Sequence, residues 1–296
     1  MRGLQSVVHC AMPRSVLIVG CGFVGRPLAR NFLEAGWQTH AITGSELTAK
    51  QLRAEPFQVR SLDIREIDAV RQLARESFDV VIHCASSRHG TASAYEAIFF
   101  EGTRNILATL NCGRFIFTSS TSVYAQTDGR WVDENSEAEP ERETGRVLRR
   151  TEDLVVSTGG TVARLAGLYG PGRCVPLQKL LEGNAIIEGD GSRLMNLLHQ
   201  SDAAAALQFL AGLEPAGIFN VADNLPVTQA DWYWYVCDIL DKPLPPNGSP
   251  DLNRKRGWTN KRVSNRKLRR LGWKPLYATF KQGVRSLVNP STEAGK

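Results

Sequence analysis

Short apolar runs alternate with helix-like patterns through the first half of the chain. The apolar runs are 15–19, 39–42, 57–61, 80–84, 114–118 and 161–164, and helix-like segments lie between them at 26–35, 66–75 and 95–110. Near-continuous apolar strands are typical of parallel sheets covered on both faces, and crossovers between parallel strands are right-handed. The pattern therefore predicts an α/β fold with a doubly wound parallel sheet.

The first apolar run leads into the glycine-rich loop Gly20-Cys-Gly-Phe-Val-Gly25, and a helix pattern follows at once. Glycines in this spacing allow a tight turn and let backbone amides approach a pyrophosphate at the helix N-terminus. The alternative is a tight turn with no ligand. Because the loop joins the first strand to the first helix, we expect a Rossmann-type dinucleotide site at Gly20, Gly22, Phe23, Val24 and Gly25.

The end of the second strand bears on the choice between NAD and NADP. A carboxylate there would accept hydrogen bonds from the ribose and repel a 2′-phosphate, whereas this chain has Thr43, Gly44 and Ser45. The hydroxyls favour NADP, and if the segment is only a polar turn, NAD remains equally open. Asp63, which ends a later strand pattern, is placed to accept from the adenine amino group or is simply a turn carboxylate.

Composition sets further limits. The 296 residues are 42% hydrophobic, and the six cysteines are scattered without metal-ligand spacing, so no zinc site or disulfide framework is indicated. No apolar run is long enough to span a membrane, and residues 1–13 resemble a flexible leader, with Met12 an alternative start, rather than a signal peptide. A cytoplasmic protein is expected.

Positive charge is concentrated near the C-terminus. The net charge is +6, and no acid occurs between Asp251 and Glu293. This basic segment indicates either a surface for phosphate groups or a solvated face. Nucleic acid is the less favoured ligand because no nucleic-acid-binding motif accompanies the charge.

The motifs together resemble an atypical member of the extended short-chain dehydrogenase/reductases, the NAD(P)-dependent epimerase/dehydratase group. Besides the glycine loop, they are Leu62-Asp-Ile64, Val81-Ile-His-Cys-Ala-Ser86, Glu101-Gly-Thr-Arg-Asn-Ile-Leu107, Phe117-Thr-Ser-Ser-Thr-Ser-Val-Tyr124, Ile218-Phe-Asn-Val221 and Leu271-Gly-Trp-Lys-Pro275. The resemblance implies that Ser120 orients a reacting oxygen. It also implies cofactor contacts at Ile64, Cys84, Ala85, Ser119 and Leu165.

The chain departs from this family at the expected acid/base pair. Counting back from Glu152, the resemblance places Tyr and Lys at positions that hold Thr144 and Leu148, and Phe99 replaces a helix-bracing Asn. A threonine hydroxyl is too weak an acid to replace a phenol, and leucine supplies no cation. We therefore consider Tyr124 or His89 as the proton donor, or a water held by Arg146.

The resemblance also implies a substrate lobe after the first domain. We expect a dinucleotide-binding domain at 14–166, which also receives about 190–215, and a smaller, irregular substrate lobe over 167–296. Ser86, His89, Arg173 and Arg262 are the candidate substrate contacts, with surface ion pairs as the alternative for the arginines. His199 and Asp202 are expected to brace the return to the first domain.

Two functions follow. The first is an oxidoreductase or epimerase that acts on a small polar substrate, sugar-like and phosphorylated or nucleotide-linked. A 4,6-dehydratase is not expected, because Thr121 and Ser122 occupy the positions of its Asp-Glu pair. The alternative is an inactive NAD(P)-binding redox sensor or partner scaffold. A homodimer is left open.

Overall fold

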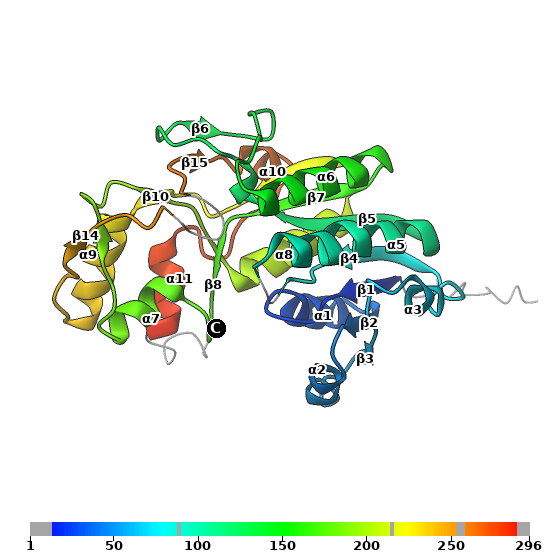
Figure 1. Cartoon of the computed structure of the whole chain (residues 1–296). Helices are drawn as coiled ribbons and strands as arrows, with labels where there is room; N and C mark the ends of the chain where they lie inside the picture. Colours follow the sequence, from blue (N-terminus) through cyan, green and yellow to red (C-terminus); the bar gives the residue numbers. More distant parts are fainter. Residues whose placement is uncertain (1–13, 88–89, 214–215, 253–257, 289–296) are drawn as a thin grey trace, which may run out of the picture.

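The computed structural model describes residues 14–87, 90–213, 216–252 and 258–288. Its centre is a seven-stranded parallel sheet in the order β12-β7-β5-β4-β1-β2-β3 (Figure 1). The strands are β1 (Ser15–Val19), β2 (Gln38–Thr43), β3 (Gln58–Ser61), β4 (Phe78–His83), β5 (Cys112–Ser120), β7 (Thr161–Leu165) and β12 (Gly217–Val221). The doubly wound α/β prediction is confirmed.

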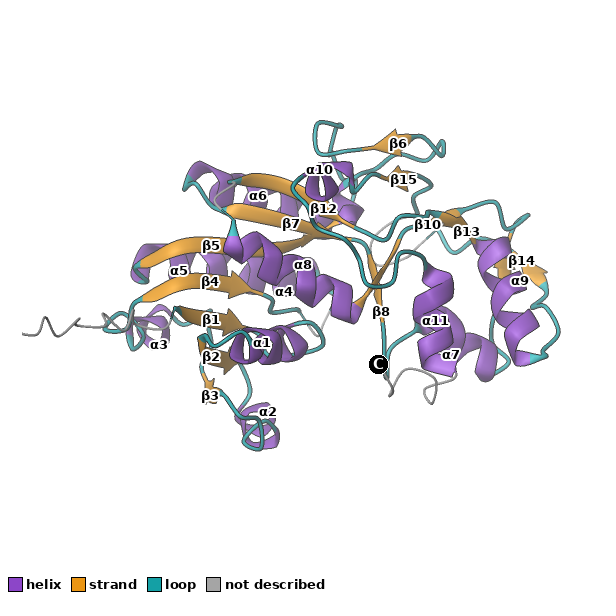
Figure 2. Cartoon of the chain, turned by 180° about the vertical axis from the view of Figure 1, so that it is seen from behind, coloured by secondary structure: helices purple, strands orange, loops and turns teal. Residues whose placement is uncertain are grey.

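Helices cover the sheet on both faces. In Figure 2, α1 (Gly25–Glu34) and α8 (Gln200–Gly212) lie side by side in front of the strands, and they pack against each other. The opposite layer contains α3 (Ile67–Arg71), α4 (Ala92–Tyr95), η1 (Glu96–Glu101), α5 (Gly102–Thr109) and α6 (Glu143–Ser157). The inner strands β1, β4 and β7 are therefore largely buried from both sides, as their apolar composition requires, whereas the edge strand β3 has no buried residue.

Three elements differ from the sequence prediction. The expected helix at 95–110 contains a π-helical stretch, η1, between α4 and α5, and the helix expected at 66–75 covers only Ile67–Arg71. The seventh strand, β12, was not predicted as part of the sheet; it pairs with β7 from Gly217↔Thr161 to Val221↔Leu165. Its distance along the chain explains the last error, because β12 has the same length as β7 but follows it only after the second group of elements begins.

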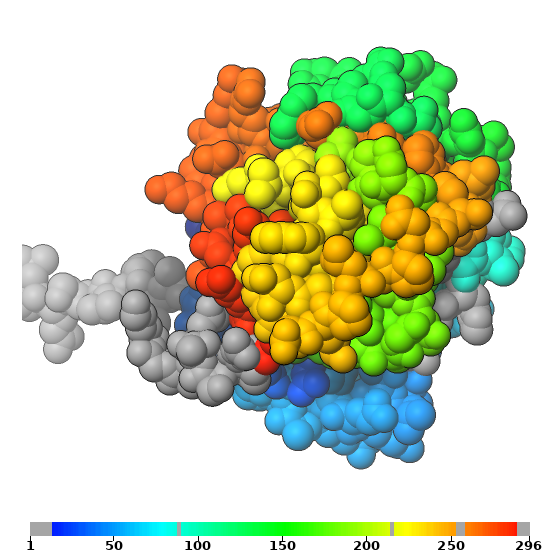
Figure 3. Space-filling model, turned by 90° about the vertical axis from the view of Figure 1, so that its left-hand side faces the viewer, coloured from blue at the N-terminus to red at the C-terminus, as the bar shows by residue number. Residues whose placement is uncertain are grey.

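A second group of elements lies beside the sheet. It contains α7 (Val175–Leu181), α9 (Gln229–Leu240) and α11 (Phe280–Val288), whose apolar side chains form a separate cluster around Trp232. Figure 3 shows this part from outside, with yellow α9 in the centre and red α11 next to it. The short strands here and at its border are β8 (Gly167–Tyr169), β9 (Ile187–Glu188), β10 (Leu194–Met195), β11 (Leu197–His199), β13 (Val227–Thr228) and β14 (Asn247–Gly248).

The remaining elements are short. They are α2 (Glu46–Gln51), η2 (Thr121–Val123), β6 (Trp131–Val132), β15 (Arg262–Val263) and α10 (Arg266–Arg270). Among the helices described, none is long and apolar enough to cross a membrane. The predicted leader at 1–13 lies outside the described residues.

Candidate active site

The glycine loop has the geometry that the sequence predicts for close backbone approach. Gly20 has φ +94°, and a Cβ there would lie 2.4 Å from Ala85 Cα; a Cβ on Gly25 would lie 2.1 Å from the Gly20 carbonyl oxygen. Larger residues are therefore excluded at both positions. A Cβ on Gly22 would meet no protein atom within 4 Å, so this glycine leaves open space above the turn.

A cavity of about 490 Å³ lies over this loop, at the carboxyl ends of the parallel strands. All the predicted cofactor residues except Gly25, which packs behind the loop, line it: Gly20, Gly22, Phe23, Val24, Thr43, Gly44, Ser45, Asp63, Ile64, Cys84, Ala85, Ser119 and Leu165. Helix α1 begins at its edge with no side-chain cap. Open space at Gly22 beside uncapped backbone amides fits a dinucleotide pyrophosphate.

The end of β2 carries hydroxyl groups and no carboxylate. Ser45 caps α2, and its hydroxyl accepts a hydrogen bond from the Thr48 amide at 3.4 Å. Nearby, Asp63 accepts hydrogen bonds from the backbone and side chain of Arg65, which hold the pKa of this carboxyl below its usual value. Asp63 is therefore ionised and available as an acceptor, although Arg65 already contacts both of its oxygens.

The end of β5 brings Thr118, Ser119 and Ser120 to the same cavity. Ser120 is buried at the N-cap of η2, where its hydroxyl accepts from the Ser122 amide at 3.2 Å. Ser119 also lines the cavity, and its hydroxyl donates to Glu152 at 2.5 Å. Ser120 therefore faces the cavity from a fixed turn, which is the position expected of a group that orients substrate.

Behind this strand end lies a buried polar network. Arg164 donates from Nε and Nη2 to Glu152, and its Nη1 donates to the Tyr124 hydroxyl at 2.8 Å. The same hydroxyl lies 2.9 Å from Asn220 Oδ1, and Tyr124 is 0% exposed. The η2 turn thus directs Tyr124 into the core. Tyr124, predicted as a proton donor, does not line the glycine cavity in this structure, and burial raises the pKa of its phenol.

Two predicted arginines also lie away from the cavity. Arg146 is on the exposed side of α6 and pairs with Glu143 at 3.1 Å, so it does not hold a water over Ser120. Arg262 donates to the Gly129 carbonyl from β15 and does not line the cavity. Neither predicted arginine lines the glycine cavity in this structure. His89 lies outside the described residues.

Two predicted substrate contacts do lie at the cavity. Ser86 and Arg173 line it, and the Arg173 guanidinium stands 5.0 Å from the centre of the Phe23 ring. Arg173 therefore places a positive charge at the cavity, beside the Phe23 ring of the glycine loop.

The sequence analysis missed Tyr95 and Ser87, which line the same cavity. Tyr95 comes from α4, is 3% exposed and packs edge-on against Phe99 at a ring distance of 4.9 Å. Of the described residues that line the cavity, Tyr95 is the only tyrosine. The family motif that specifies a tyrosine concerns α6, whereas α4 precedes β5 and carries no local signal for this role.

Helix α6 presents Thr144, Leu148 and Glu152 on its buried side, four residues apart. Leu148 lines the cavity, and α6 contains neither tyrosine nor lysine. The wall of the cavity is therefore apolar where this helix meets it.

His199 and Asp202 connect the two parts of the molecule. Asp202 accepts from the backbone amides of Leu276 and Tyr277, and His199 caps α8 through the Ser201 amide. Burial raises the pKa of Asp202 to about 6. These contacts join α8 to the segment that precedes α11. No group of three metal-ligating side chains occurs among the described residues.

The fold and the glycine cavity define a Rossmann-type dinucleotide-binding protein. A sequence profile of the NAD dependent epimerase/dehydratase family matches residues 16–222, and the chain belongs to that family. It is 31% identical over 221 residues to Protein YeeZ of Escherichia coli strain K12, covering 70% of this chain and 77% of YeeZ.

Solved structures agree. A structure from Methylobacillus flagellatus assigned as an NAD-dependent epimerase/dehydratase is 25% identical, with a TM-score of 0.77 and coverage of 93% of this chain and 97% of that chain. The UDP-glucose 4-epimerase of Thermus thermophilus, in complex with NAD, is 20% identical, with a TM-score of 0.78 and coverage of 93% and 97%. The second likeness concerns the fold alone.

Proposed function

We propose that the protein is an NAD(P)-dependent oxidoreductase or epimerase for a small polar substrate. The observation that carries the proposal is that the glycine loop, Ser120 and Arg173 meet at one cavity. A bare nucleotide sensor has no need of both a hydroxyl at the strand end and a cation in the same cavity wall. The bound cofactor would supply or accept a hydride.

In this proposal Ser120 hydrogen-bonds the reacting oxygen of the substrate, and Tyr95 gives or takes its proton. A phenol is a competent general acid, and Tyr95 lines the same cavity as Ser120. The Phe99 ring packs edge-on against Tyr95 and limits its rotation. Arg173 binds an anionic group of the substrate, such as a phosphate or carboxylate.

The substrate class is sugar-like or nucleotide-linked. The family and the nucleotide-sugar epimerase with the same fold support this class. A 4,6-dehydratase is not proposed, because that reaction needs a pair of carboxyl groups. Of the described residues that line the cavity, only Asp63 carries a carboxylate, and it pairs with Arg65. The β2 strand end, with hydroxyls in place of a carboxylate, supports a preference for NADP over NAD.

The alternative is an inactive NAD(P)-binding sensor or scaffold. The apolar Leu148 in the cavity wall favours it, because a lysine at that place would have held the ribose and a catalytic tyrosine. Scattered cysteines support a reducing, cytoplasmic setting for either function. A homodimer remains a proposal, tested by the mass of the protein in solution.

Nicotinamide absorbance separates the two functions. Purified protein is incubated with NADPH or NADH and a panel of aldoses, ketoses, nucleotide sugars and small carbonyl compounds. We expect turnover with at least one nucleotide-linked or phosphorylated member, and its loss in Ser120→Ala. An epimerase returns the hydride to its substrate and so causes no net change in nicotinamide absorbance. The sugar products are therefore also analysed by NMR. Tight cofactor binding without product from any substrate would establish the sensor.

A further inference from the structure

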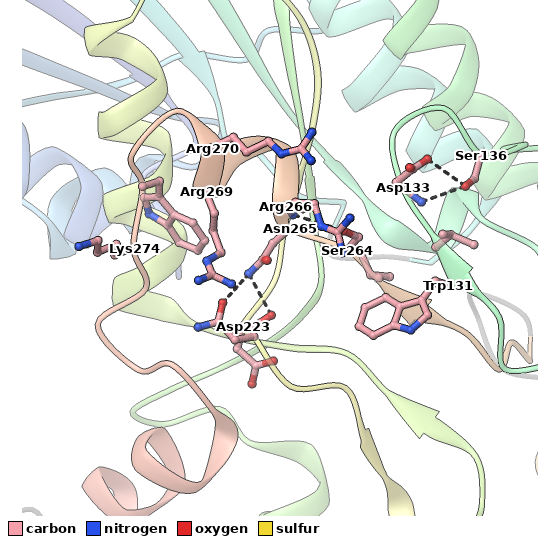
Figure 4. Close-up of a pocket in the computed structure, with 14 residues that line it drawn as sticks. Trp131, Asp133, Ser136, Asp223, Ser264, Asn265, Arg266, Arg269, Arg270 and Lys274 are labelled. Atoms are coloured by element: carbon pink, nitrogen blue, oxygen red, sulfur yellow. Dashed lines mark hydrogen bonds between the residues drawn. The ribbon is translucent and has the colours of Figure 1, made fainter.

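A second cavity lies at the edge of the sheet, away from the glycine loop (Figure 4). Its volume is about 600 Å³, and its walls come from β6 and the loop after it, the loop after β12, and the segment from β15 through α10 to Lys274. It shares no lining residue with the glycine cavity. The proposed reaction uses none of these residues.

Cations from the basic segment line this cavity. Arg266, Arg269 and Arg270 project from α10 at spacings of three and four residues, and Lys274 follows. In Figure 4, Arg266 and Arg270 extend toward the side of Asp133 and Ser136, whereas Arg269 extends toward Asn265. Like charges at these helix spacings repel each other, so their grouping does not stabilise α10.

These cations also lack counter-ions. In the part of the chain that the structure describes, the side chains of Arg266, Arg269, Arg270 and Lys274 make no ion pair, whereas other arginines do: Arg60 with Glu76, Arg65 with Asp63, and Arg149 with Glu152 and Asp153. Two acids are among the described lining residues: Asp133, whose Oδ1 accepts from Ser136 and the Asn135 amide, and the buried Asp223. The four cations outnumber them. The cavity is therefore positive.

The wall also offers aromatic and hydrogen-bonding groups. Trp131 is 58% exposed on β6, so its indole face is open for stacking. Trp273 is buried, and its Nε1–H has no hydrogen-bond acceptor within the described residues. An anionic oxygen inside the cavity is the kind of acceptor that this donor lacks.

We propose that the cavity beside α10 binds a nucleoside diphosphate or triphosphate as a second ligand, separate from the dinucleotide. Arginine forks match phosphate oxygens, and Trp131 stacks on the base. The ligand is a small molecule rather than a nucleic acid, because the cations face a bounded cavity with walls from three parts of the chain. The acid-free basic segment of the sequence is thereby explained as one wall of a site.

Calorimetry with ADP and inorganic pyrophosphate tests the proposal on the full chain, with and without saturating NADPH. Both probes are expected to bind, and ADP more tightly because it can stack. Arg266→Gln/Arg269→Gln should weaken both at least tenfold, while Trp131→Ala should weaken ADP alone. These side chains are exposed, so the melting temperature should not move.

The control is Arg75→Gln/Lys179→Gln, which removes two exposed positive charges far from the cavity in sequence and outside its walls. It should bind both probes as the native protein does. The proposal is overturned if neither probe binds, if the control weakens binding as much as the α10 variant, or if NADPH displaces ADP. Tight binding of a single-stranded oligonucleotide in place of ADP would also overturn it, in favour of a nucleic-acid surface.

Discussion

Arg164 and Glu152 form a two-point ion pair inside the protein, with Nε 3.0 Å from Oε1 and Nη2 2.6 Å from Oε2. Their side chains are 2% and 0% exposed. The pair joins β7 to α6, and Ser119 extends it to the end of β5. It therefore fixes the strand end on which Ser120 stands.

Removing one partner of this pair should destabilise the fold strongly. Glu152→Gln leaves the Arg164 guanidinium buried without a counter-charge, which typically costs about 3–5 kcal/mol. The matched control is Glu143→Gln, which breaks the exposed pair with Arg146 and should cost less than about 1 kcal/mol. Urea unfolding measures both; equal losses would show that the buried pair contributes no more than a surface pair.

The glycine loop allows binding and folding to be separated. Gly22→Ala adds a Cβ that meets no protein atom, so the melting temperature should stay unchanged. The same Cβ projects where the pyrophosphate should lie, and we expect the cofactor Kd to rise at least ~10-fold, or ~1.4 kcal/mol. Gly212→Ala, also without steric conflict, is the control. Unchanged cofactor binding in Gly22→Ala would place the dinucleotide elsewhere.

The preference for NADP can be tested at the cap of α2. Aspartate caps helices as well as serine does, so Ser45→Asp should fold normally. Its charge would repel a 2′-phosphate and accept from a ribose hydroxyl, which should weaken NADPH and strengthen NADH. Ser45→Asn keeps the cap without the charge and serves as the control. If NADH binds the native protein more tightly than NADPH, the interpretation of this strand end is refuted.

The sequence predicted the cofactor side of the cavity far better than the catalytic side. Gly20 and Gly25 are required because a Cβ at either position would clash with nearby backbone, and this requirement is visible in the spacing of the glycine motif. The direction of Tyr124 depends on the η2 turn and on Arg164, forty residues away along the chain. Tyr95 reaches the cavity from a helix with no motif of its own. Whether such a residue reaches the cavity depends on tertiary packing, which cannot be predicted from a single sequence.

Two tyrosines should respond differently to loss of their hydroxyls. Tyr95→Phe should lower kcat by about 100-fold or more, with cofactor affinity retained, because it removes a general acid. Tyr124→Phe should leave kcat of the folded enzyme nearly intact and lower stability by about 1–3 kcal/mol, because Arg164 and Asn220 lose a buried partner. Steady-state kinetics and urea unfolding on both variants decide; the reverse pattern would return the acid role to Tyr124.

Lys261 should make stability depend on pH. Its ammonium is 4% exposed and donates to the Tyr124 carbonyl at 2.7 Å and to Thr259 at 2.9 Å. Burial, with a smaller contribution from Arg193, lowers its pKa from 10.5 to about 7. Between these values the unfolded chain binds a proton that the folded chain does not. The free energy of unfolding should therefore rise with pH in this window, by up to ~1.4 kcal/mol per pH unit. Below about pH 7, Lys261 is protonated in both the folded and the unfolded chain, and the full cost of burying its charge is then present.

The comparison of Lys261→Met with the native protein isolates this effect. The difference in unfolding free energy between the two should change in favour of the native protein as pH rises from 7 to 9.5, because other titrating groups, such as the buried Cys21 thiol, are common to both. Lys179→Met, an exposed lysine on α7, should give a constant difference over the same range. Parallel curves for Lys261→Met and the native protein would mean that Lys261 stays charged in the folded state, held by its two acceptors.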